Sequence, residues 1–212
     1  MKKHSSKILT FLSAVLTALI FISCAKPGDA SVEKAVEAYR LGKYDQALEL
    51  FNQAMEQETR YSDAMIFTFM SNTYAAQEDF ENAVIWLEKS LELKKDYRGF
   101  VTLGMNYQTL KNYSKAEESY LKAVEMNPEK GEGWASLGMM YLEQEKKTEE
   151  AVKALEKGAE FAPRIAVIRA YLGAAYFKQG LSEKAAAEFN EAERLGCQNL
   201  DQIKEKFGAE EL

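Results

Sequence analysis

The first residue that could carry chemistry is Cys24, which stands at the end of a hydrophobic run near the N-terminus. Lys2, Lys3 and Lys7 precede any acidic residue, and the 15 residues of segment 8–22 are apolar except for Thr and Ser. A helix that crosses a bilayer needs about 20 apolar residues, so this run is short for a permanent span. A positive start and a short apolar core that ends at small residues are typical of a signal peptide.

The stretch Phe21-Ile22-Ser23-Cys24 resembles the lipobox of bacterial lipoproteins, although Phe21 stands where Leu is usual. In that family the cysteine thiol receives diacylglycerol, the chain is cut before the cysteine, and the new amino group is usually acylated. The resemblance implies a signal peptide over residues 1–23, lipidation of Cys24 by acyl chains such as palmitate, and a tether over residues 24–30. The alternative is that Cys24 merely stands where an ordinary signal or an uncleaved anchor ends.

The charge of the N-terminus also predicts an orientation. Positive residues stay on the cytoplasmic side, so residues 25–212 are expected outside the inner membrane whether or not cleavage occurs. Ala25 follows the cysteine, where an aspartate would indicate inner-membrane retention by the rule known for enteric lipoproteins. We therefore expect an exported protein that is lipid-anchored at the periplasmic face of the bacterial outer membrane. The choice between inner and outer membrane stays open.

Residue types that catalysis or metal binding would need are scarce. The single histidine, His4, lies in the segment expected to be removed, which takes away the commonest general base and metal ligand. The sequence has no phosphate-binding glycine loop and no cysteine pair at metal spacing. Cys197 fits a small capping residue better than a nucleophile, since nothing around it predicts a lowered thiol pKa. We expect a non-enzyme with no cofactor, no metal and no small-molecule substrate.

The composition indicates an acidic, helical chain. The 212 residues contain 27 Lys and Arg against 33 Asp and Glu, for a formal net charge of −6, and only three prolines. An acidic surface repels phosphate backbones, so we expect no nucleic-acid partner. Few prolines, together with abundant Ala, Glu, Lys, Leu and Gln, favour an all-α fold.

A period of about 34 residues runs through the rest of the chain. Five alanines align at separations of 36, 33, 35 and 34 residues, and a large apolar residue follows each of them by four positions. Spacings of three and four place such residues on one face of a helix, which predicts helix–turn–helix hairpins. The aligned alanines are Ala47, Ala83, Ala116, Ala151 and Ala185, followed by Phe51, Leu87, Tyr120, Leu155 and Phe189.

This pattern resembles the tetratricopeptide repeat, or TPR. The clearest copy, WASLGMMYLEQEKKTEEAVKALEKGAEFAP, carries the family's Trp, Gly, Tyr and Pro as Trp134, Gly138, Tyr141 and Pro163. The resemblance implies an all-α, right-handed superhelix of about five hairpins with a short C-terminal capping helix. The domain is expected over residues 31–208, with repeats at about 28–61, 64–97, 97–130, 131–165 and 166–199, and the cap at 200–207.

The family further implies a concave groove that binds a protein or peptide. Its groove residues come from the second, fifth, sixth, ninth, twelfth and thirteenth positions of each repeat, and most of those selected here are small or apolar, with recurring methionine. Met70 and Met140 are instead expected in the core, and the alternative for Met65 and Met105 is that they pack between adjacent repeats. The selected groove residues are Met65, Thr68, Asn72, Ala75, Arg98, Val101, Met105, Gln108, Ala135, Met139, Leu142, Ala170, Ala174, Phe177 and Lys178.

These observations predict a membrane-anchored TPR lipoprotein that acts as a protein–protein interaction scaffold or assembly factor in the bacterial cell envelope. Pilus or secretin assembly and outer-membrane complex assembly both fit this description. Its partners would be one or more proteins in the groove and the membrane through the lipid. A broad-specificity, chaperone-like periplasmic holdase and a protease adaptor are the alternatives, and no residue pattern separates them.

Overall fold

The structure, a computed structural model, describes residues 26–144 and 146–212. These residues form eleven α-helices and no β-strand, so the predicted all-α fold of five hairpins and a closing helix is confirmed. The helices fall into two compact units, Met1–Leu93 and Lys94–Leu212, called unit 1 and unit 2 below. The expected signal peptide and Cys24 lie outside the described residues.

Among the described residues, no helix is both long enough and apolar enough to cross a bilayer.

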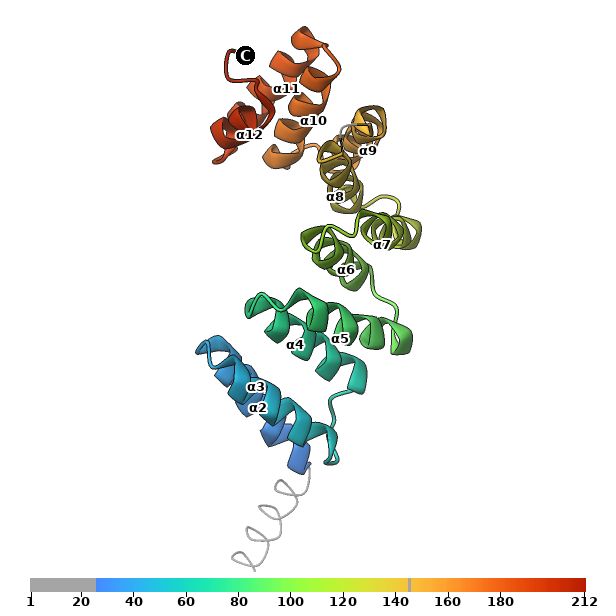
Figure 1. The fold of residues 1–212 in the computed structure, drawn as a ribbon, viewed down its shortest axis with the longest axis vertical. Helices are drawn as coiled ribbons and strands as arrows, with labels where there is room; N and C mark the ends of the chain where they lie inside the picture. The colour runs from blue at the N-terminus through green and yellow to red at the C-terminus, as the bar shows by residue number, and fades with distance from the viewer. Residues whose placement is uncertain (1–25, 145) are drawn as a thin grey trace, which may run out of the picture. The chain divides into compact units, whose positions relative to one another are not determined.

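Unit 1 consists of two helical hairpins, α2 with α3 and α4 with α5, and α3 also packs against α4 (Figure 1). Each hairpin turns within three residues, and Gly42 adopts a positive φ of 72° in the first turn, a conformation that glycine accepts without steric cost. The bounds are α2 Pro27–Arg40, α3 Tyr44–Met55, α4 Asp63–Ala76 and α5 Phe80–Leu93.

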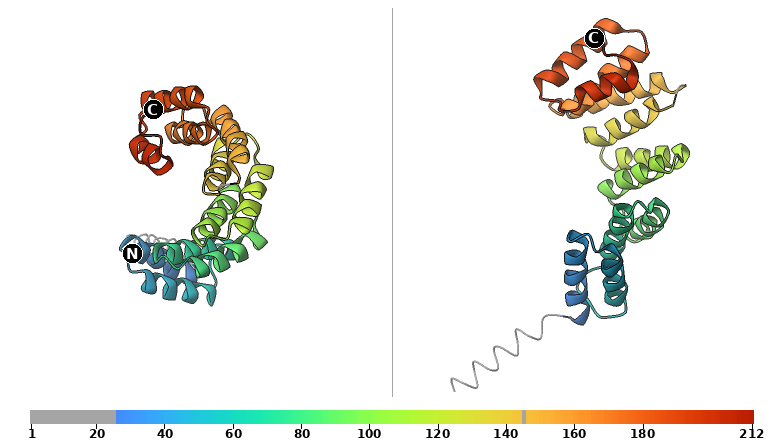
Figure 2. Two further views of the ribbon diagram at one scale, coloured as in Figure 1. Left: turned by 45° about the horizontal axis from the view of Figure 1, so that its top comes forward. Right: turned by 60° about the vertical axis from the view of Figure 1, so that its left-hand side comes forward.

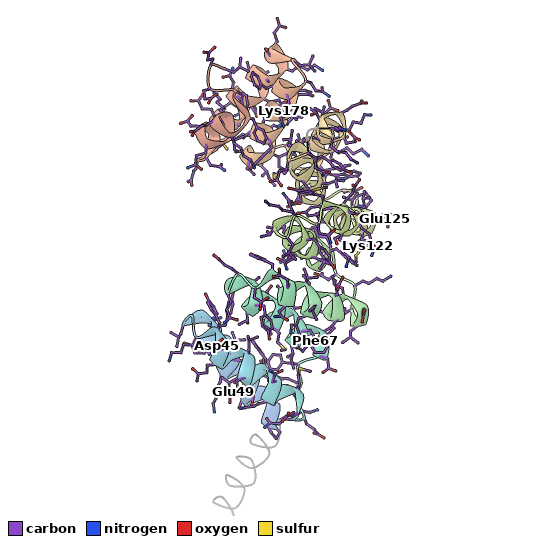
Figure 3. The ribbon with its side chains drawn as sticks, in the orientation of Figure 1. Asp45, Glu49, Phe67, Lys122, Glu125 and Lys178 are labelled. Carbon is purple, nitrogen blue, oxygen red and sulfur yellow. The ribbon has the colours of Figure 1, made fainter. Side chains whose placement is uncertain are left out.

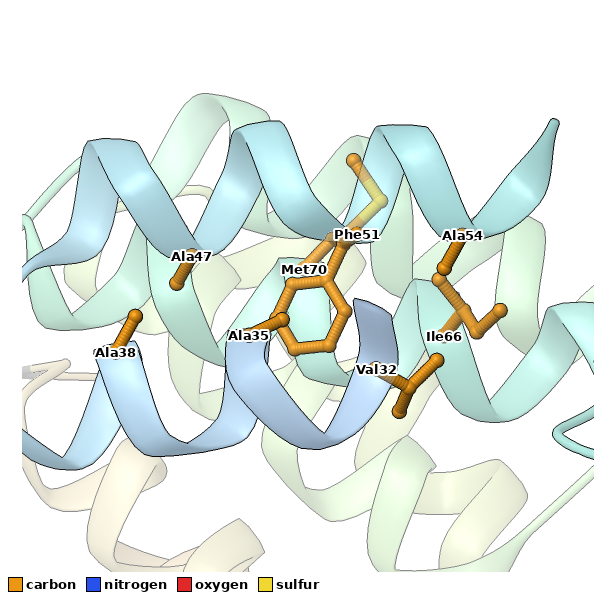
Figure 4. Close-up of a cluster of buried hydrophobic side chains, with 8 residues drawn as sticks. All are labelled: Val32, Ala35, Ala38, Ala47, Phe51, Ala54, Ile66 and Met70. Atoms are coloured by element: carbon orange, nitrogen blue, oxygen red, sulfur yellow. The ribbon is translucent and has the colours of Figure 1, made fainter. Parts of the chain in front are cut away.

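The core of unit 1 forms around Phe51 of α3. Its side chain is only 1% exposed, and its ring lies against Ala35 of α2 (Figure 4). The Phe51 ring also stacks on that of Phe69 in α4, with centroids 5.6 Å apart and planes at 9°. Met70 is fully buried beside them, as the sequence predicted. One aromatic side chain therefore joins three helices from two consecutive repeats.

The start of α2 is held by a buried carboxylate. Asp29 accepts hydrogen bonds from the backbone N–H of Lys26 and Arg60, at 3.1 and 2.8 Å, and from the Thr59 hydroxyl at 2.8 Å. These bonds satisfy free donors at the first turn of the helix and tie it to the loop between α3 and α4. The Arg60 N–H is the main reason why the pKa of Asp29 lies below its ordinary value.

This arrangement corrects the expected extent of the tether. Residues 24–30 were expected to form a tether, whereas α2 already begins at Pro27, whose fixed φ suits the first position of a helix. The predicted first repeat, at about 28–61, agrees with this start, whereas the tether and domain bounds placed it at residue 31. The residues that complete the cap, Thr59 and Arg60, are about 30 positions away in the sequence. Only Ala25 and Lys26 therefore separate Cys24 from the folded part.

Unit 2 contains three hairpins and the closing helix (Figures 1 and 2). Consecutive hairpins are in contact, because α7 packs on α8 and α9 packs on α10. The bounds are α6 Tyr97–Thr109, α7 Tyr113–Met126, α8 Gly131–Leu142, α9 Thr148–Phe161, α10 Ala166–Lys178, α11 Ser182–Arg194 and α12 Leu200–Phe207.

A glycine of the first helix faces a large side chain of the second helix in each hairpin of unit 2. A Cβ atom added to Gly104 would lie 2.5 Å from the Tyr120 ring, and one added to Gly173 would lie 2.7 Å from the Phe189 ring. Non-bonded carbon atoms do not approach this closely, so these positions accept no side chain unless their neighbours move. Close packing thus offsets the conformational cost of glycine inside a helix.

The closing helix α12 packs chiefly against α10, and less against α11. Leu200 and Ile203 are buried, and the Phe207 ring meets the Tyr171 ring of α10 edge-on, with centroids 6.1 Å apart. The glycine that ends α12, Gly208, adopts the left-handed conformation common after a helix. This placement brings the end of α12 to the same side of α10 as Tyr171.

We expect Gly104→Ala to lower the free energy of unfolding by about 1–2 kcal/mol, although alanine is the better helix former by about 1 kcal/mol. The added methyl group would overlap the buried Tyr120 ring. Chemical denaturation measures this change, and Ala187→Gly on the exposed side of α11 gives the ordinary glycine penalty as a control. A Gly104→Ala protein more stable than the wild type would contradict the close approach.

We expect Asp29→Asn to lower the melting temperature at pH 7, because the amide lacks the charge that the Arg60 and Lys26 N–H groups stabilise. A carboxyl whose pKa is depressed by folding contributes stability above its unfolded pKa of about 3.9, and this contribution is lost as the pH falls through the folded pKa. The difference from the wild type should therefore shrink below about pH 4. Asp45→Asn on α3 is the matched surface control, and a pH-independent difference would reject the carboxylate's role.

Candidate functional site

A pocket with a volume of about 330 Å³ lies within unit 2. The first helices of the three hairpins, α6, α8 and α10, form its sides together with α12. Helix α7 forms its floor. A pocket of this volume is at the lower end of the range for sites that bind ligands or side chains. The lining residues are Met105, Gln108, Thr109, Tyr120, Ser136, Met139, Glu143, Tyr171 and Lys206.

Two methionines and a tyrosine supply the apolar surface of this pocket. Met105 of α6 is 54% exposed, Met139 of α8 is half-buried, and the Tyr171 ring of α10 is half-buried as well. Methionine side chains are flexible and polarizable, so they adapt to differently shaped apolar partners. This surface can bind an apolar side chain of another protein.

The polar groups on the floor of the pocket form a hydrogen bond with each other. The buried Tyr120 hydroxyl donates a hydrogen bond of 3.0 Å to Oε1 of Gln108. Burial, with the nearby negative charge of Glu143, raises the pKa of Tyr120 above its ordinary value, so the phenol stays protonated. The floor is therefore a neutral hydrogen-bonded surface.

An ion pair closes one end of the pocket. Lys206 Nζ of α12 lies 3.5 Å from Oε1 of Glu143, which caps the end of α8. Both side chains are partly exposed, so the pair contributes little to stability, of the order of 0–1 kcal/mol. Its main effect is to neutralise the two charges of the pocket and to link α12 to the repeat before α10.

The structure brings three of the residues selected from the sequence into this pocket: Met105, Gln108 and Met139. Arg98 is exposed, and Val101 and Phe177 are half-buried, all within unit 2 but outside the pocket lining. Lys178 donates a hydrogen bond of 3.1 Å to the backbone oxygen of Leu142 and lies over the Phe207 ring.

Four small or apolar residues of the selection are not on a free surface. Ala135 and Leu142 of α8 are 2% and 1% exposed, and Ala170 and Ala174 of α10 are fully buried. Adjacent helices pack on these residues, since α8 lies between α6 and α10, and α12 covers α10. Their side chains therefore support the stack of helices and cannot contact a ligand in this conformation.

The residues selected in unit 1 have separate environments. Met65 is 46% exposed at the start of α4, and Ala75 is half-buried. The Thr68 hydroxyl bonds to the Ala64 carbonyl oxygen and to Ser90, both at 2.9 Å, so it serves packing within the hairpin. Asn72 is exposed and lines a smaller pocket of unit 1.

The sequence-based selection did not include Ser136 and Tyr171, which line the unit 2 pocket. Their repeat position could have indicated both of them. Each stands two residues before the mid-helix glycine of its repeat, Gly138 or Gly173, and so occupies the sixth repeat position. Thr109 and Glu143 occupy the thirteenth position and were missed as well. Lys206 had no such signal, because it follows the last repeat and reaches the pocket only through the packing of α12.

Acidic side chains and a cysteine, residue types that often carry chemistry, lie in the described part of the chain. Within residues 26–144 and 146–212, no three His, Cys, Asp or Glu side chains are grouped so that they could hold a metal ion. Cys197 is partly exposed, and its Sγ lies 3.4 Å from Oδ1 of Asn199.

Comparison with known proteins identifies the repeats. Family models described as tetratricopeptide repeat match residues 32–96, and residues 97–130 and 131–165. The chain belongs to the TPR family. Human tetratricopeptide repeat protein 12 is 31% identical over 101 residues, which cover 47% of this TPR protein and 14% of that relative. The chain thus spans only a small part of this relative.

Solved TPR structures share the fold. A fragment of MamA from Desulfovibrio magneticus RS-1 superimposes with a TM-score of 0.69 at 19% identity, over 78% of this chain and 93% of that one. YrrB, described as a TPR protein with an unusual peptide-binding site, gives a TM-score of 0.65 at 22% identity, over 83% and 90%. At these identities the likeness establishes the fold alone.

Proposed function

We propose that this TPR protein is a non-enzymatic scaffold or assembly factor of the bacterial cell envelope that captures a segment of a partner protein. The observation that carries the proposal is the unit 2 pocket, where Met105, Met139 and Tyr171 offer apolar surface from three successive repeats. Apolar side chains on adjacent first helices can contact several positions of one bound segment. The peptide-binding site described for YrrB is a use of the same fold that agrees with this proposal.

The membrane part of the proposal rests on the N-terminal sequence. A lipidated Cys24 would anchor the chain, since two or more acyl chains hold a protein firmly, each buried methylene contributing about 0.8 kcal/mol. With α2 beginning at Pro27, the anchor and the repeats would be almost adjacent. A lipid-anchored scaffold on the periplasmic side would suit the assembly of pilus secretins or other outer-membrane complexes.

A broad-specificity holdase or protease adaptor is the second candidate, and the exposed methionines favour it. Met105 is 54% exposed, and the charged side chains that line its pocket, Glu143 and Lys206, are paired with each other. Flexible apolar surfaces of this kind accept several partners, because little in them rejects a wrong one.

In-cell photocrosslinking from position 105 tests the proposed binding surface. We expect a crosslinkable amino acid at position 105 to trap one dominant partner, and one at position 122 to trap far less. Lys122 is the matched control, since it is exposed on α7 (Figure 3) and outside the pocket lining. A broad set of outer-membrane precursors from position 105 would favour the holdase. Crosslinks from position 122 alone would reject the unit 2 pocket as the binding surface.

Cys24→Ala tests the anchor independently. Because the thiol is the proposed lipid acceptor, the variant should lose metabolic labelling by palmitate and should either accumulate as the uncleaved form or leave the membrane fraction. Cys197→Ala is the control, since it removes the other cysteine and should keep both the label and the membrane association. A Cys24→Ala protein that is processed and stays membrane-bound would contradict the lipoprotein proposal.

A further inference from the structure

Unit 1 contains a pocket of its own, which the proposed function of unit 2 does not use. Its volume is about 170 Å³, and it lies between α2, α3 and α4. Aromatic and aliphatic side chains form most of its surface, and three polar side chains complete it. These residues are Val36, Tyr39, Phe51 and Phe69, with Arg40, Asn72 and Thr73.

The apolar walls of this pocket are held in place by core packing, and its volume matches that of one side chain. Phe51 is fixed in the core, and its stacked partner Phe69 forms the adjoining wall. An engineered apolar cavity of about 150 Å³ in another protein binds benzene, so a pocket of this volume can hold one phenyl ring or branched aliphatic side chain. Val36 and Tyr39 on α2 provide the remaining apolar surface.

Arg40 brings an unused positive charge to the pocket. Its side chain is exposed in the last turn of α2, and no described residue forms an ion pair with it. Arg169 and Arg194, in contrast, each bind a glutamate. A guanidinium binds a carboxylate through two parallel N–H···O bonds, so Arg40 offers a directional site for one acid.

Asn72 distinguishes between an extended and a helical ligand. It is exposed on α4 and makes no hydrogen bond with the described residues. An amide side chain can donate to a backbone carbonyl and accept from a backbone N–H at the same time. An extended segment has such groups free, whereas a helix uses them internally. The amide therefore favours an extended ligand.

We propose that this pocket binds an extended segment of a partner protein in which an apolar side chain and an acidic side chain are two residues apart. In an extended chain, residues i and i+2 point to the same side, about 7 Å apart. The apolar side chain would fill the pocket, the acid would bind Arg40, and the backbone between them would bind Asn72. A single acid suits unit 1, because acidic residues outnumber basic ones in it and would repel an acidic run.

Binding of a short peptide to the full-length protein in detergent tests this motif. The probe is an acetylated and amidated peptide with Phe-Thr-Glu between Gly and Ser residues, labelled for fluorescence anisotropy. We expect saturable binding that weakens about tenfold for Phe-Thr-Gln, which loses the charge-assisted bonds, and at least as much for Ala-Thr-Glu. Equal binding of all three peptides would overturn the proposal.

Protein variants assign the effect to this pocket. Arg40→Gln should abolish the preference for Phe-Thr-Glu over Phe-Thr-Gln while leaving the affinity for Phe-Thr-Gln unchanged. Lys34→Gln removes the same charge from α2 at an exposed position outside the pocket lining, and should keep the full preference. Loss of the preference in both variants would mean that general electrostatics, and not the Arg40 site, selects the acid.

Two further outcomes would overturn the choice of ligand. Tighter binding of the same residues in a helix closed by a lactam bridge would mean that the pocket takes a helix. Equal binding of a peptide that ends in Phe with a free carboxylate would mean that Arg40 recognises a chain terminus. Met105→Ala should leave the binding of the Phe-Thr-Glu probe unchanged, so a failure here and a failure of the unit 2 proposal can be told apart.

Discussion

The close approach of the two helices in each hairpin is the constraint on which the rest of this structure depends. In unit 2, Gly104 and Gly173 leave no room for even a methyl group beside the rings of Tyr120 and Phe189. In unit 1, the Ser71 hydroxyl donates a hydrogen bond of 2.7 Å to the Ala83 carbonyl oxygen of the facing helix. A small residue against a large side chain or a backbone thus sets the distance and the register of each pair.

This constraint also decides which side chains are available for binding. The small and aromatic residues of a first helix pack within its own hairpin and against the next hairpin. The remaining positions of that helix form the free surface. In α6 and α8 these positions hold Met105 and Met139. The last repeat differs, because Ala170 and Ala174 are buried and α12 packs on α10. The closing helix thereby ends the stack and supplies a wall of the pocket.

The sequence predicted those features that depend on residues close together in the chain, and it did not predict those that depend on residues far apart. The hairpins and the closing helix depend on spacings within one repeat, which a 34-residue period reveals, and they were predicted. The cap at the start of α2 is completed by Thr59 and Arg60, and the position of Lys206 depends on the packing of α12 on α10, which brings it to Glu143, 63 residues away. Ala135 and Leu142 occupy groove positions in the family pattern, yet neighbouring helices bury them. Repeat position alone does not reveal such contacts.

The charges at the two pockets imply different degrees of selectivity. In unit 2 the carboxylate of Glu143 already neutralises Lys206, so a charged partner would have to replace an existing ion pair and gain little. Apolar contact with adaptable methionines then dominates, and it discriminates weakly between partners. In unit 1 the Arg40 guanidinium has no ion-pair partner among the described residues, so an acid at the right distance adds affinity that a neutral residue lacks. Because specificity is a difference between affinities, the unpaired cation can select a partner more sharply than the larger apolar pocket.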